Sequence, residues 1–212
     1  PKERLARIIL SEPQRPVVVA GSTVPGEEEI VLKALKIARE KVPNLGLVLA
    51  PRHPDRFAEI PAIVEAAGFK CVRRTDLEPG QWKTDDVLLL DTLGELASVF
   101  SLATVGFVGG SLVPQGGHNV LEVSASGVPV LTGPNVQNFQ EIANEFHKEG
   151  ALVLVKDAAE LAREIVSFVT DKARRDEVGG KGRALIEPNR GALGRTVDGL
   201  SSLIEPTRSG SA

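Results

Sequence analysis

The chain has 212 residues, of which 42% are hydrophobic and 25% are charged, and its formal net charge is −3. This length suffices for one large α/β domain or two small ones. Acidic and basic residues are interspersed without a basic stripe, so nucleic acid is not expected as a partner. No apolar run approaches the roughly 20 residues of a membrane-spanning helix, and residues 1–20 lack a signal-peptide pattern, so we expect this piece of chain to be soluble.

The order of patterns along the chain predicts alternating strands and helices. The first part predicts a helix at 5–10, a turn at 13–16, a strand at 16–20, a loop at 21–26, a helix at 27–41, a strand at 45–50, a helix at 54–67, and strands at 69–73 and 86–90. The second part predicts strands at 104–108, 128–131 and 152–155, helices at 119–126 and 137–148, and two or three amphipathic helices between 158 and 204.

Most of the predicted strands are continuous apolar runs, which are typical of strands buried on both faces of a parallel sheet. We therefore expect an α/β fold with a single Rossmann-like, doubly wound parallel sheet and helices on both faces. Residues 1–15 are interpreted as an interdomain linker or helix remnant, 16–205 as one domain, and 206–212 as a disordered tail. The chain contains no methionine, even at position 1, which we interpret as a sign of an excised C-terminal half.

Metal sites are not expected from the sequence. Cys71 is the one cysteine, and His53, His118 and His147 lack the spacing of metal ligands. His147, near a predicted helix end, is interpreted as structural or solvent-facing. Trp82 is interpreted as the anchor of a surface loop and not as a platform for stacking a base.

Ligands of open parallel sheets bind beyond the carboxyl ends of the strands, where loops converge and helix N-termini point outward. Five loops follow predicted strands, at 21–23, 51–54, 91–95, 109–122 and 133–139. The sequence has neither a P-loop nor a G-x-G-x-x-G segment after the first strand, which removes the main support for an ATPase or a simple dehydrogenase.

The loop at 109–122, GGSLVPQGGHNVLE, is the richest in candidates. Gly109, Gly110, Gly116 and Gly117 permit backbone conformations and close approaches that a Cβ atom would block. We expect backbone N–H groups of this loop, which includes Ser111, to face a phosphate.

Asn119 and Glu122 have the spacing of a capping box, which predicts a well-started helix. Glu122 equally suits hydrogen bonds from both hydroxyls of a ribose, and the two roles can coexist in part. His118 suits either a ligand or the neighbouring loop carbonyls. Asn138 suits either an N-cap or a hydrogen bond to a sugar or phosphate. Ser22 is a further candidate for ligand binding, because it lies in the first of the five loops.

Arg52 and His53 directly follow a buried strand, which aims cationic donors at the cleft. A guanidinium can form two charge-assisted bonds to a phosphate, or it can lie over the sheet edge. Thr92 and Gly94 precede a second helix start at the cleft, where Glu95 is interpreted as an ordinary first-turn carboxylate.

Four segments, taken in order, resemble the C-terminal domain of 3-deoxy-D-manno-octulosonic acid (Kdo) transferases. They are PRHPDRF at 51–57, DTLGEL at 91–96, FVGGSLVPQGGHNVLE at 107–122 and GPNVQNFQEI at 133–142. The resemblance extends from about Val17 to Ile204. It departs at Gln115, where a basic residue is expected, and at Val120 and Val123, where prolines are expected.

The resemblance implies the donor-binding, C-terminal half of a two-domain GT-B glycosyltransferase that transfers Kdo from CMP-Kdo to a lipid A precursor with inversion. It implies that the N-terminal half holds the acceptor site, the membrane-facing surface and the acidic general base. No catalytic residue is therefore expected here, and the fragment alone is expected to be inactive. The full-length protein is expected at the cytoplasmic face of the bacterial inner membrane, peripheral or N-terminally anchored, in lipopolysaccharide biosynthesis.

No cofactor is expected besides the donor CMP-Kdo, and the lack of an Asp-x-Asp segment near a strand end predicts metal-independent donor binding. In this interpretation Glu122 holds the ribose, while Arg52, loop N–H groups and helix dipoles stabilise departing CMP. The expected CMP-binding residues are Ser22, Arg52, His53, Thr92, Gly94, Gly109, Gly110, Ser111, Gly116, Gly117, His118, Asn119, Glu122 and Asn138.

Two alternatives stay open at this point. The first is a UDP-sugar-dependent GT-B transferase or 2-epimerase domain, which shares the architecture and a glycine-rich, glutamate-bearing loop. The second is a non-catalytic nucleotide-binding module, because the chain has no evident pair of nucleophile and base.

Overall fold

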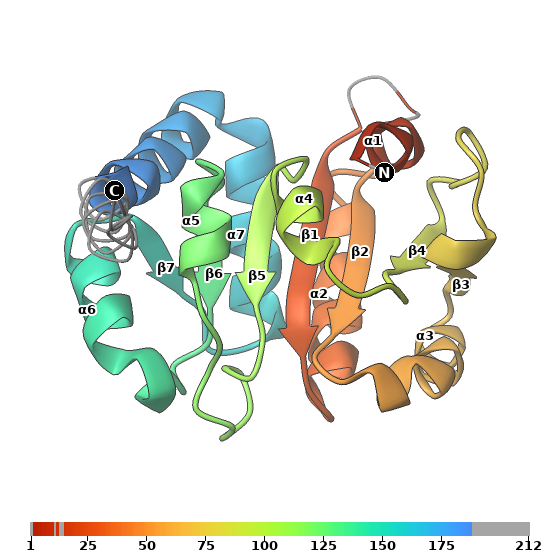
Figure 1. The fold of residues 1–212 in the computed structure, drawn as a ribbon, viewed down its shortest axis with the longest axis horizontal. Coiled ribbons are helices and arrows are strands. Elements are labelled where there is room, and N and C mark those ends of the chain that lie inside the picture. Colours follow the sequence, from red (N-terminus) through yellow and green to blue (C-terminus); the bar gives the residue numbers. More distant parts are fainter. Residues whose placement is uncertain (1, 11, 13–14, 188–212) are drawn as a thin grey trace, which may run out of the picture.

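A computed structural model describes residues 2–10, 12 and 15–187 of the chain (Figure 1). Within these residues the strands form one seven-stranded parallel sheet in the order β3-β4-β2-β1-β5-β6-β7. The predicted doubly wound α/β fold is thereby confirmed. The predicted helical segment beyond 187 and the predicted tail at 206–212 lie outside the described residues.

The strands and helices follow the predicted order with shifted ends. The strands are β1 Val17–Thr23, β2 Gly46–Pro51, β3 Lys70–Arg73, β4 Asp86–Leu89, β5 Val105–Val108, β6 Val130–Thr132 and β7 Leu152–Leu154. The α-helices are α1 Lys2–Ile9, α2 Glu27–Arg39, α3 Ile60–Ala66, α4 Leu96–Phe100, α5 Leu121–Ala125, α6 Gln140–Lys148 and α7 Ala158–Thr170, followed by a helix at 172–187.

Two predicted elements differ from the structure in more than a small shift of their ends. The first strand continues through 21–23, predicted as loop, because these residues still pair with β2 across a register shift. The predicted helix at 54–67 is divided into a 3-10 turn, Pro54–Ala58, and α3. Pro61 lies in the first turn of α3, where a residue without a backbone N–H is tolerated, and it prevents one continuous helix from crossing this point.

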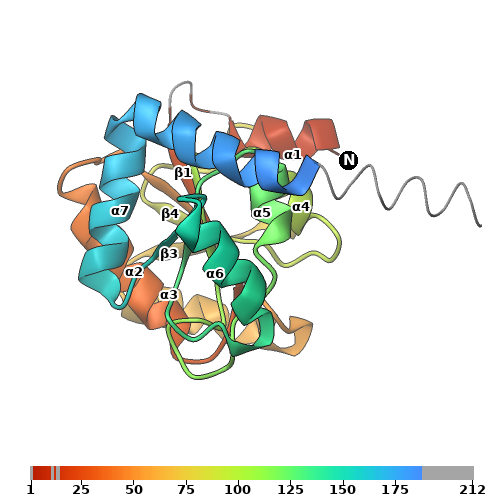
Figure 2. The same ribbon diagram turned by 90° about the vertical axis from the view of Figure 1, so that its left-hand side faces the viewer.

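Helices cover both faces of the sheet, as Figure 2 shows from the side. α2, α3 and α7 pack on one face, while α1, α4, α5 and α6 pack on the other. Successive residues of each central strand point to opposite faces, so Val18 joins the first core and Val19 the second. Each such fully buried valine stabilises the fold by about 1.5–3 kcal/mol.

The segment interpreted as a linker remnant is part of the core. Leu5, Ile8 and Ile9 of α1 are 0–1% exposed and pack in the second core cluster. Its expected role as a linker between two domains stays a prediction.

The chain reverses its direction of winding at β1. It passes from β1 to β2 on one side, and it returns to β5 on the other side of β1. The loops after β1 and β5 therefore leave the sheet in opposite directions and open a crevice, which is where doubly wound sheets bind ligands. These carboxyl ends lie at the lower edge in Figure 1.

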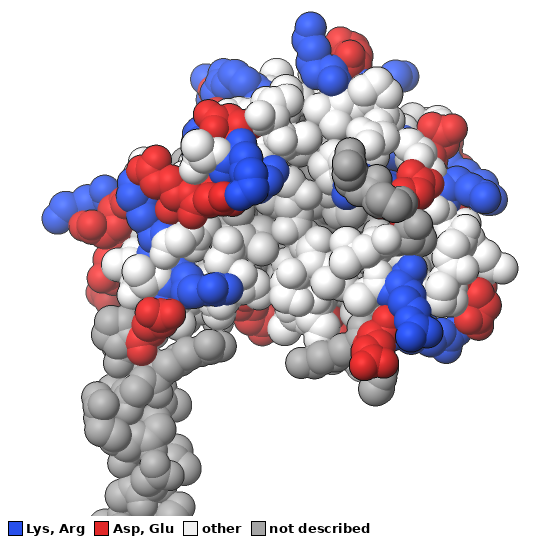
Figure 3. All heavy atoms as spheres, turned by 90° about the horizontal axis from the view of Figure 1, so that it is seen from above, with Lys and Arg blue, Asp and Glu red and all other residues white. Residues whose placement is uncertain are grey.

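The side of the molecule at the amino ends of the strands shows no patch of one charge among the described residues (Figure 3). Figure 3 looks onto the molecule from above, toward the amino ends of the strands. Among the described residues seen from this side, basic and acidic side chains alternate around the rim, and the centre is uncharged.

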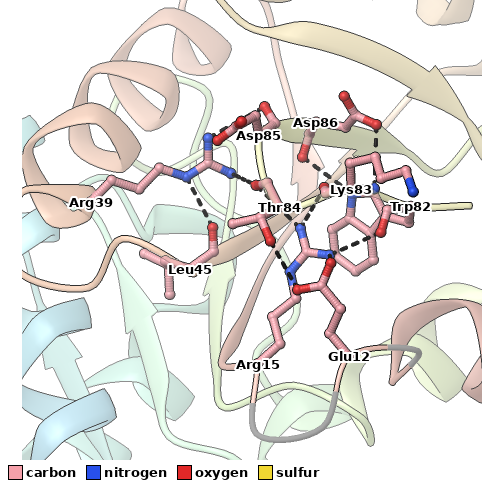
Figure 4. Close-up of polar contacts among 9 residues, drawn as sticks. All are labelled: Glu12, Arg15, Arg39, Leu45, Trp82, Lys83, Thr84, Asp85 and Asp86. Carbon is pink, nitrogen blue, oxygen red and sulfur yellow. Dashed lines mark hydrogen bonds and ion pairs between the residues drawn. The ribbon is translucent and has the colours of Figure 1, made fainter. Parts of the chain in front are cut away.

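At this amino edge, two arginines hold the loop that precedes β4 (Figure 4). Arg15 lies over the Trp82 ring, 3.9 Å from its centroid, and donates to the carbonyl oxygens of Trp82 at 3.3 Å and Lys83 at 2.8 Å. Arg39 donates to the carbonyl oxygen of Thr84 at 2.6 Å. Trp82 is 1% exposed, so the expected surface-loop anchor is instead a core residue beneath Arg15.

We expect Arg15→Ala to lower the free energy of unfolding by about 3 kcal/mol, because it removes carbonyl hydrogen bonds and a cation–π contact from a buried site. Urea unfolding followed by circular dichroism measures this change. Arg163→Ala is the control, since the Arg163 side chain is 66% exposed and its ion pairs are worth little. Equal stability of the two variants would contradict the role assigned to Arg15.

Candidate functional site

A pocket of about 290 Å³ opens at the carboxyl ends of β1, β2 and β4. The ends of these strands, the turns after them and the first turns of α4 and α5 supply its walls. Its lining residues are Ser22, Ala50, Pro51, Arg52, Phe57, Leu90, Thr92, Leu93, Gly94, Leu96, Ala97 and Glu122. Among the expected site residues it brings together Ser22, Arg52, Thr92, Gly94 and Glu122.

Two larger hollows lie on the described surface, and the first of them shares Ala97 and Glu122 with this pocket. One of about 730 Å³ lies between α1, α4, α5 and the helix at 172–187, and one of about 620 Å³ lies between α2 and α3. We place the site at the smaller pocket because it combines a guanidinium, a carboxylate and hydroxyl groups at the crevice of the sheet.

Three groups that can be cationic lie together beside the pocket. Burial lowers the pKa of His118, and the positive charges of Arg52 and His53 lower it further. Nε2 of His118 is buried and has no hydrogen-bond partner among the described residues. Within the same part of the chain, no carboxylate forms an ion pair with Arg52. The region is therefore suited to an anion.

Several N–H groups of the glycine-rich loop donate inside the protein, which differs from their expected orientation toward a phosphate. Those of Gly110 and Ser111 donate to the carboxylate of Glu27 at 2.6 and 2.8 Å. The N–H of Gly109 donates to the carbonyl of Gly21 at 2.9 Å, and that of Gly117 to the carbonyl of Gly110 at 2.7 Å. These donors hold the loop in place and are not available to a phosphate.

Ser111 is also fully used inside the protein. Its hydroxyl donates to the carbonyl of Val108 at 2.7 Å and accepts from the N–H of Gly133 at 2.8 Å. Ser111 is 0% exposed, so its side chain supports the loop, and its contact with a ligand stays a prediction.

Two of the glycines are required by close contacts. A Cβ atom at Gly109 would lie 2.5 Å from the carbonyl oxygen of Ser22 and 2.7 Å from Oε2 of Glu27. Gly110 has a φ of +71°, and a Cβ there would lie 2.9 Å from the His118 ring. The first glycine pair thus lets the loop pass against β1 and lets His118 fold over it.

Asn138 ties the loop before α6 to the second glycine pair. Its Nδ2 donates to the carbonyl oxygens of Gln115 at 3.2 Å and Gly117 at 3.4 Å, and its backbone N–H donates to Gly116 at 2.9 Å. The side chain caps neither the 3-10 turn Gln137–Phe139, which precedes α6, nor α6 itself, so the N-cap interpretation is wrong. A ligand contact by Asn138 stays a prediction.

The capping box of α5 does not form. Oδ1 of Asn119 accepts from the N–H of Leu121 at 2.9 Å, and Val120 holds the N-cap position without a side-chain bond. Glu122 is exposed and lines the pocket, and its carboxylate has no hydrogen-bond or ion-pair partner among the described residues.

Glu95 keeps the 92–95 turn in place, as expected of a structural carboxylate. It accepts from the hydroxyl of Thr92 and pairs with Arg74 at 3.1 Å. Gly94, with a φ of +77°, completes the turn.

His147, near the end of α6, also has the structural role that was expected. Its Nδ1 lies 3.2 Å from the carbonyl oxygen of Leu152.

Sequence reasoning missed Glu27 and Glu28, which are 0% exposed at the start of α2. The available signal was a run of three glutamates directly after Gly26, at a predicted helix start. Such carboxylates favour a helix N-terminus wherever they point, so the pattern alone did not distinguish these two from solvent-facing residues.

Comparison with known proteins defines the chain's class. The glycosyl transferases group 1 family matches residues 77–185. The structure of α,α-trehalose-6-phosphate synthase from Burkholderia multivorans covers 94% of this chain and 45% of its own, with a TM-score of 0.53 and 18% identity, a likeness of fold alone. Fold and pocket together define one half of a GT-B glycosyltransferase.

Closer relatives define the family within that class. The 3-deoxy-D-manno-octulosonic acid transferase of Haemophilus influenzae is 38% identical over 90% of this chain and 45% of its own length. The structure of the C-terminal CMP-Kdo binding domain of WaaA from Acinetobacter baumannii has a TM-score of 0.76 and 33% identity, covering 82% of this chain and 90% of that one. The chain belongs to the glycosyl transferases group 1 family, and within it to the Kdo transferases.

The chain spans less than half the length of the curated Kdo transferases of Haemophilus influenzae and Bordetella pertussis, 45% and 44% respectively. Within residues 2–187, as far as they are described, no helix combines the length and hydropathy that crossing a bilayer requires. The same residues contain no group of three or more His, Cys, Asp or Glu side chains arranged to hold a metal ion.

We expect Gly109→Ala to lower the free energy of unfolding by about 2 kcal/mol or more, because the new Cβ meets backbone atoms that cannot move aside. Gly180→Ala is the matched control: its Cβ would meet nothing within 4 Å on the helix at 172–187. There we expect a gain of about 0.5–1 kcal/mol. Urea unfolding of both variants checks this contrast, and a neutral Gly109→Ala would contradict it.

We expect Arg52→Gln to raise the pKa of His118, because a neighbouring positive charge disfavours the imidazolium form. The pKa should stay below its ordinary value, since burial is the larger cause of the lowering. NMR titration of the imidazole protons measures the change, with His147 as the internal reference. An unchanged His118 titration would show that Arg52 does not act on this ring.

Proposed function

We propose that this chain binds CMP-Kdo at the carboxyl-edge pocket and forms the donor half of an enzyme that transfers Kdo. The 33% identity to a CMP-Kdo binding domain, over 90% of that domain, supports the ligand. The observation that carries the proposal is the presence of Arg52 and Glu122 on the walls of one pocket. Arg52 suits the phosphate, and Glu122 suits the ribose hydroxyls.

The chemistry follows from the charge of the leaving group. Transfer breaks the bond between the anomeric carbon of Kdo and a phosphate oxygen, and negative charge develops on CMP. Arg52 stabilises this charge, with His53 and His118 beside it. Since Gly109, Gly110 and Ser111 donate inside the protein, we assign the stabilisation to side chains and not to these amides.

The remaining parts of the reaction belong to a further half of the enzyme in this proposal. That half supplies the lipid A acceptor, the general base that takes the proton from the attacking hydroxyl, and the surface that faces the cytoplasmic leaflet of the inner membrane. The hydroxyl attacks opposite the phosphate, so the anomeric configuration inverts. Donor binding requires no metal in this scheme, because the cations near the pocket neutralise the phosphate.

We expect Arg52→Ala and Glu122→Ala each to weaken CMP binding about tenfold or more, because each removes a charge-assisted contact. Isothermal titration calorimetry of this chain with CMP measures the dissociation constants. Arg163→Ala, a change at an exposed arginine far from the pocket in the sequence, should leave the affinity unchanged. Wild-type affinity in both pocket variants would refute the proposed site.

Nucleotide choice separates this proposal from a UDP-sugar-dependent domain. Thermal unfolding in the presence of CMP, UMP or UDP should show stabilisation by CMP alone, because a ligand that binds only the native state raises its stability. Stabilisation by UDP and not by CMP would favour the transferase or 2-epimerase alternative. Transfer by the longer protein, lost on Arg52→Ala, would exclude a non-catalytic nucleotide-binding module.

A further inference from the structure

Helix α2 begins with two buried carboxylates and one exposed carboxylate. Glu27 and Glu28 are both 0% exposed, whereas Glu29 is exposed. A buried carboxylate is unfavourable unless hydrogen bonds or an opposite charge compensate it. The partners of Glu27 and Glu28 therefore show what these residues do.

Glu27 binds the glycine-rich loop. Its Oε1 accepts from the N–H groups of Ser111 and Leu112, both at 2.8 Å, and its Oε2 accepts from that of Gly110 at 2.6 Å. The N–H of Val24 adds a longer bond of 3.3 Å. Burial raises the pKa of Glu27, and these four N–H groups oppose the rise. The carboxylate occupies the concave turn of 110–112 in the way that an external anion would.

Glu28 binds the loop after β2. Its two oxygens accept from Nη1 of Arg56 at 2.7 Å and from Nη2 at 3.3 Å. Arg56 is 7% exposed and lies in the 3-10 turn, Pro54–Ala58, that directly follows Arg52 and His53. This ion pair therefore fixes the turn that directly follows Arg52, which lines the pocket, and His53 beside it.

Helix geometry explains how adjacent residues reach two loops. Consecutive residues of an α-helix point about 100° apart with a rise of about 1.5 Å, so Glu27 and Glu28 extend in different directions from one rigid turn. α2 begins at the lower edge of the sheet in Figure 1, where both loops leave their strands. Neither glutamate lines the pocket, so neither contacts a ligand there.

We propose that Glu27 and Glu28 form a clamp that sets the position of the 51–57 loop relative to the 109–112 loop and thereby arranges the donor-binding side chains. Glu27 and Glu28 are positioning residues for nucleotide binding. One arm places Arg52 and His53, and the other places the segment against which His118 packs. This inference rests on the proposed binding of CMP.

The test uses Glu27→Gln, Glu28→Gln and the double variant, with Glu29→Gln as a matched control on the same helical turn. Glutamine keeps the shape of the side chain but lacks the charge, and its NH₂ group opposes an N–H donor. We expect each of the first two substitutions to weaken CMP binding about tenfold by calorimetry, at a temperature where circular dichroism shows every variant folded. Glu29→Gln should bind as the wild type does.

The double variant distinguishes a clamp from two separate supports. If the relative placement of the loops is what matters, losing either arm already releases it, and the double variant should bind no more weakly than the weaker single variant. If the losses of CMP affinity in the two single variants multiply in the double variant, that result would overturn the clamp. A lowered unfolding temperature with unchanged CMP affinity would also overturn it, because that result describes residues that only stabilise the fold.

Hydrogen exchange tests the Glu27 arm independently of the ligand. In Glu27→Gln, the amide protons of Gly110, Ser111 and Leu112 should exchange at least about tenfold faster, while Glu28→Gln should leave them protected. Unchanged exchange in Glu27→Gln would overturn the clamp even if CMP binds. If the wild-type chain does not bind CMP, the proposed function fails, and the exchange result still decides whether Glu27 holds the loop.

Discussion

The hydrogen bonds that compensate the buried carboxylate of Glu27 hold the loops at the carboxyl edge of this sheet in place. The Glu27 carboxylate lies out of reach of solvent, and a carboxylate in that position must be bound by donors that face it together. Three successive N–H groups from 110–112 do so, although they lie 83–85 residues away in the sequence. The loop after β5 is thus fixed against the start of α2 at the crevice between β1 and β5, and the position of His118 follows from it.

The charged side chains at the two ends of the sheet differ in their partners. At the amino edge, the two Nη groups of Arg15 and the guanidinium of Arg39 donate to carbonyl oxygens, and the Arg15 guanidinium is covered by Trp82. Nε of Arg15 has no hydrogen-bond partner among the described residues. At the carboxyl edge, among the described residues, Arg52 forms no ion pair and Nε2 of His118 has no partner. An arginine without an ion pair is unfavourable for the isolated fold but available to an anion, which agrees with the phosphate contact proposed for Arg52.

Much of the fold could be predicted because it follows from local patterns. Apolar runs such as 45–50 identified strands of a parallel sheet, and the polar residues after them identified Arg52 and the pocket edge. The partners of buried groups could not be predicted, because they are distant in the sequence. Nothing near Ser111 indicates that its N–H meets Glu27, and nothing near Trp82 indicates that Arg15, 67 residues earlier, donates to its carbonyl. The capping box failed for a local reason, since Oδ1 of Asn119 accepts from the N–H of Leu121, two residues further on, and Val120 holds the N-cap position.

The donor's identity must be decided by side chains, since the fold alone cannot decide it. A glycosyl transferase half with this sheet is recognisable at 18% identity, so strand order and crevice are compatible with many loop sequences. In this chain the glycine-rich loop uses its N–H groups for Glu27, which makes it a support whose geometry does not depend on the ligand. In the proposed function, selectivity then depends on groups that line the pocket, namely Arg52, Glu122 and the 92–94 turn. A change of donor could therefore evolve at these positions while the bonds of Glu27 stay the same.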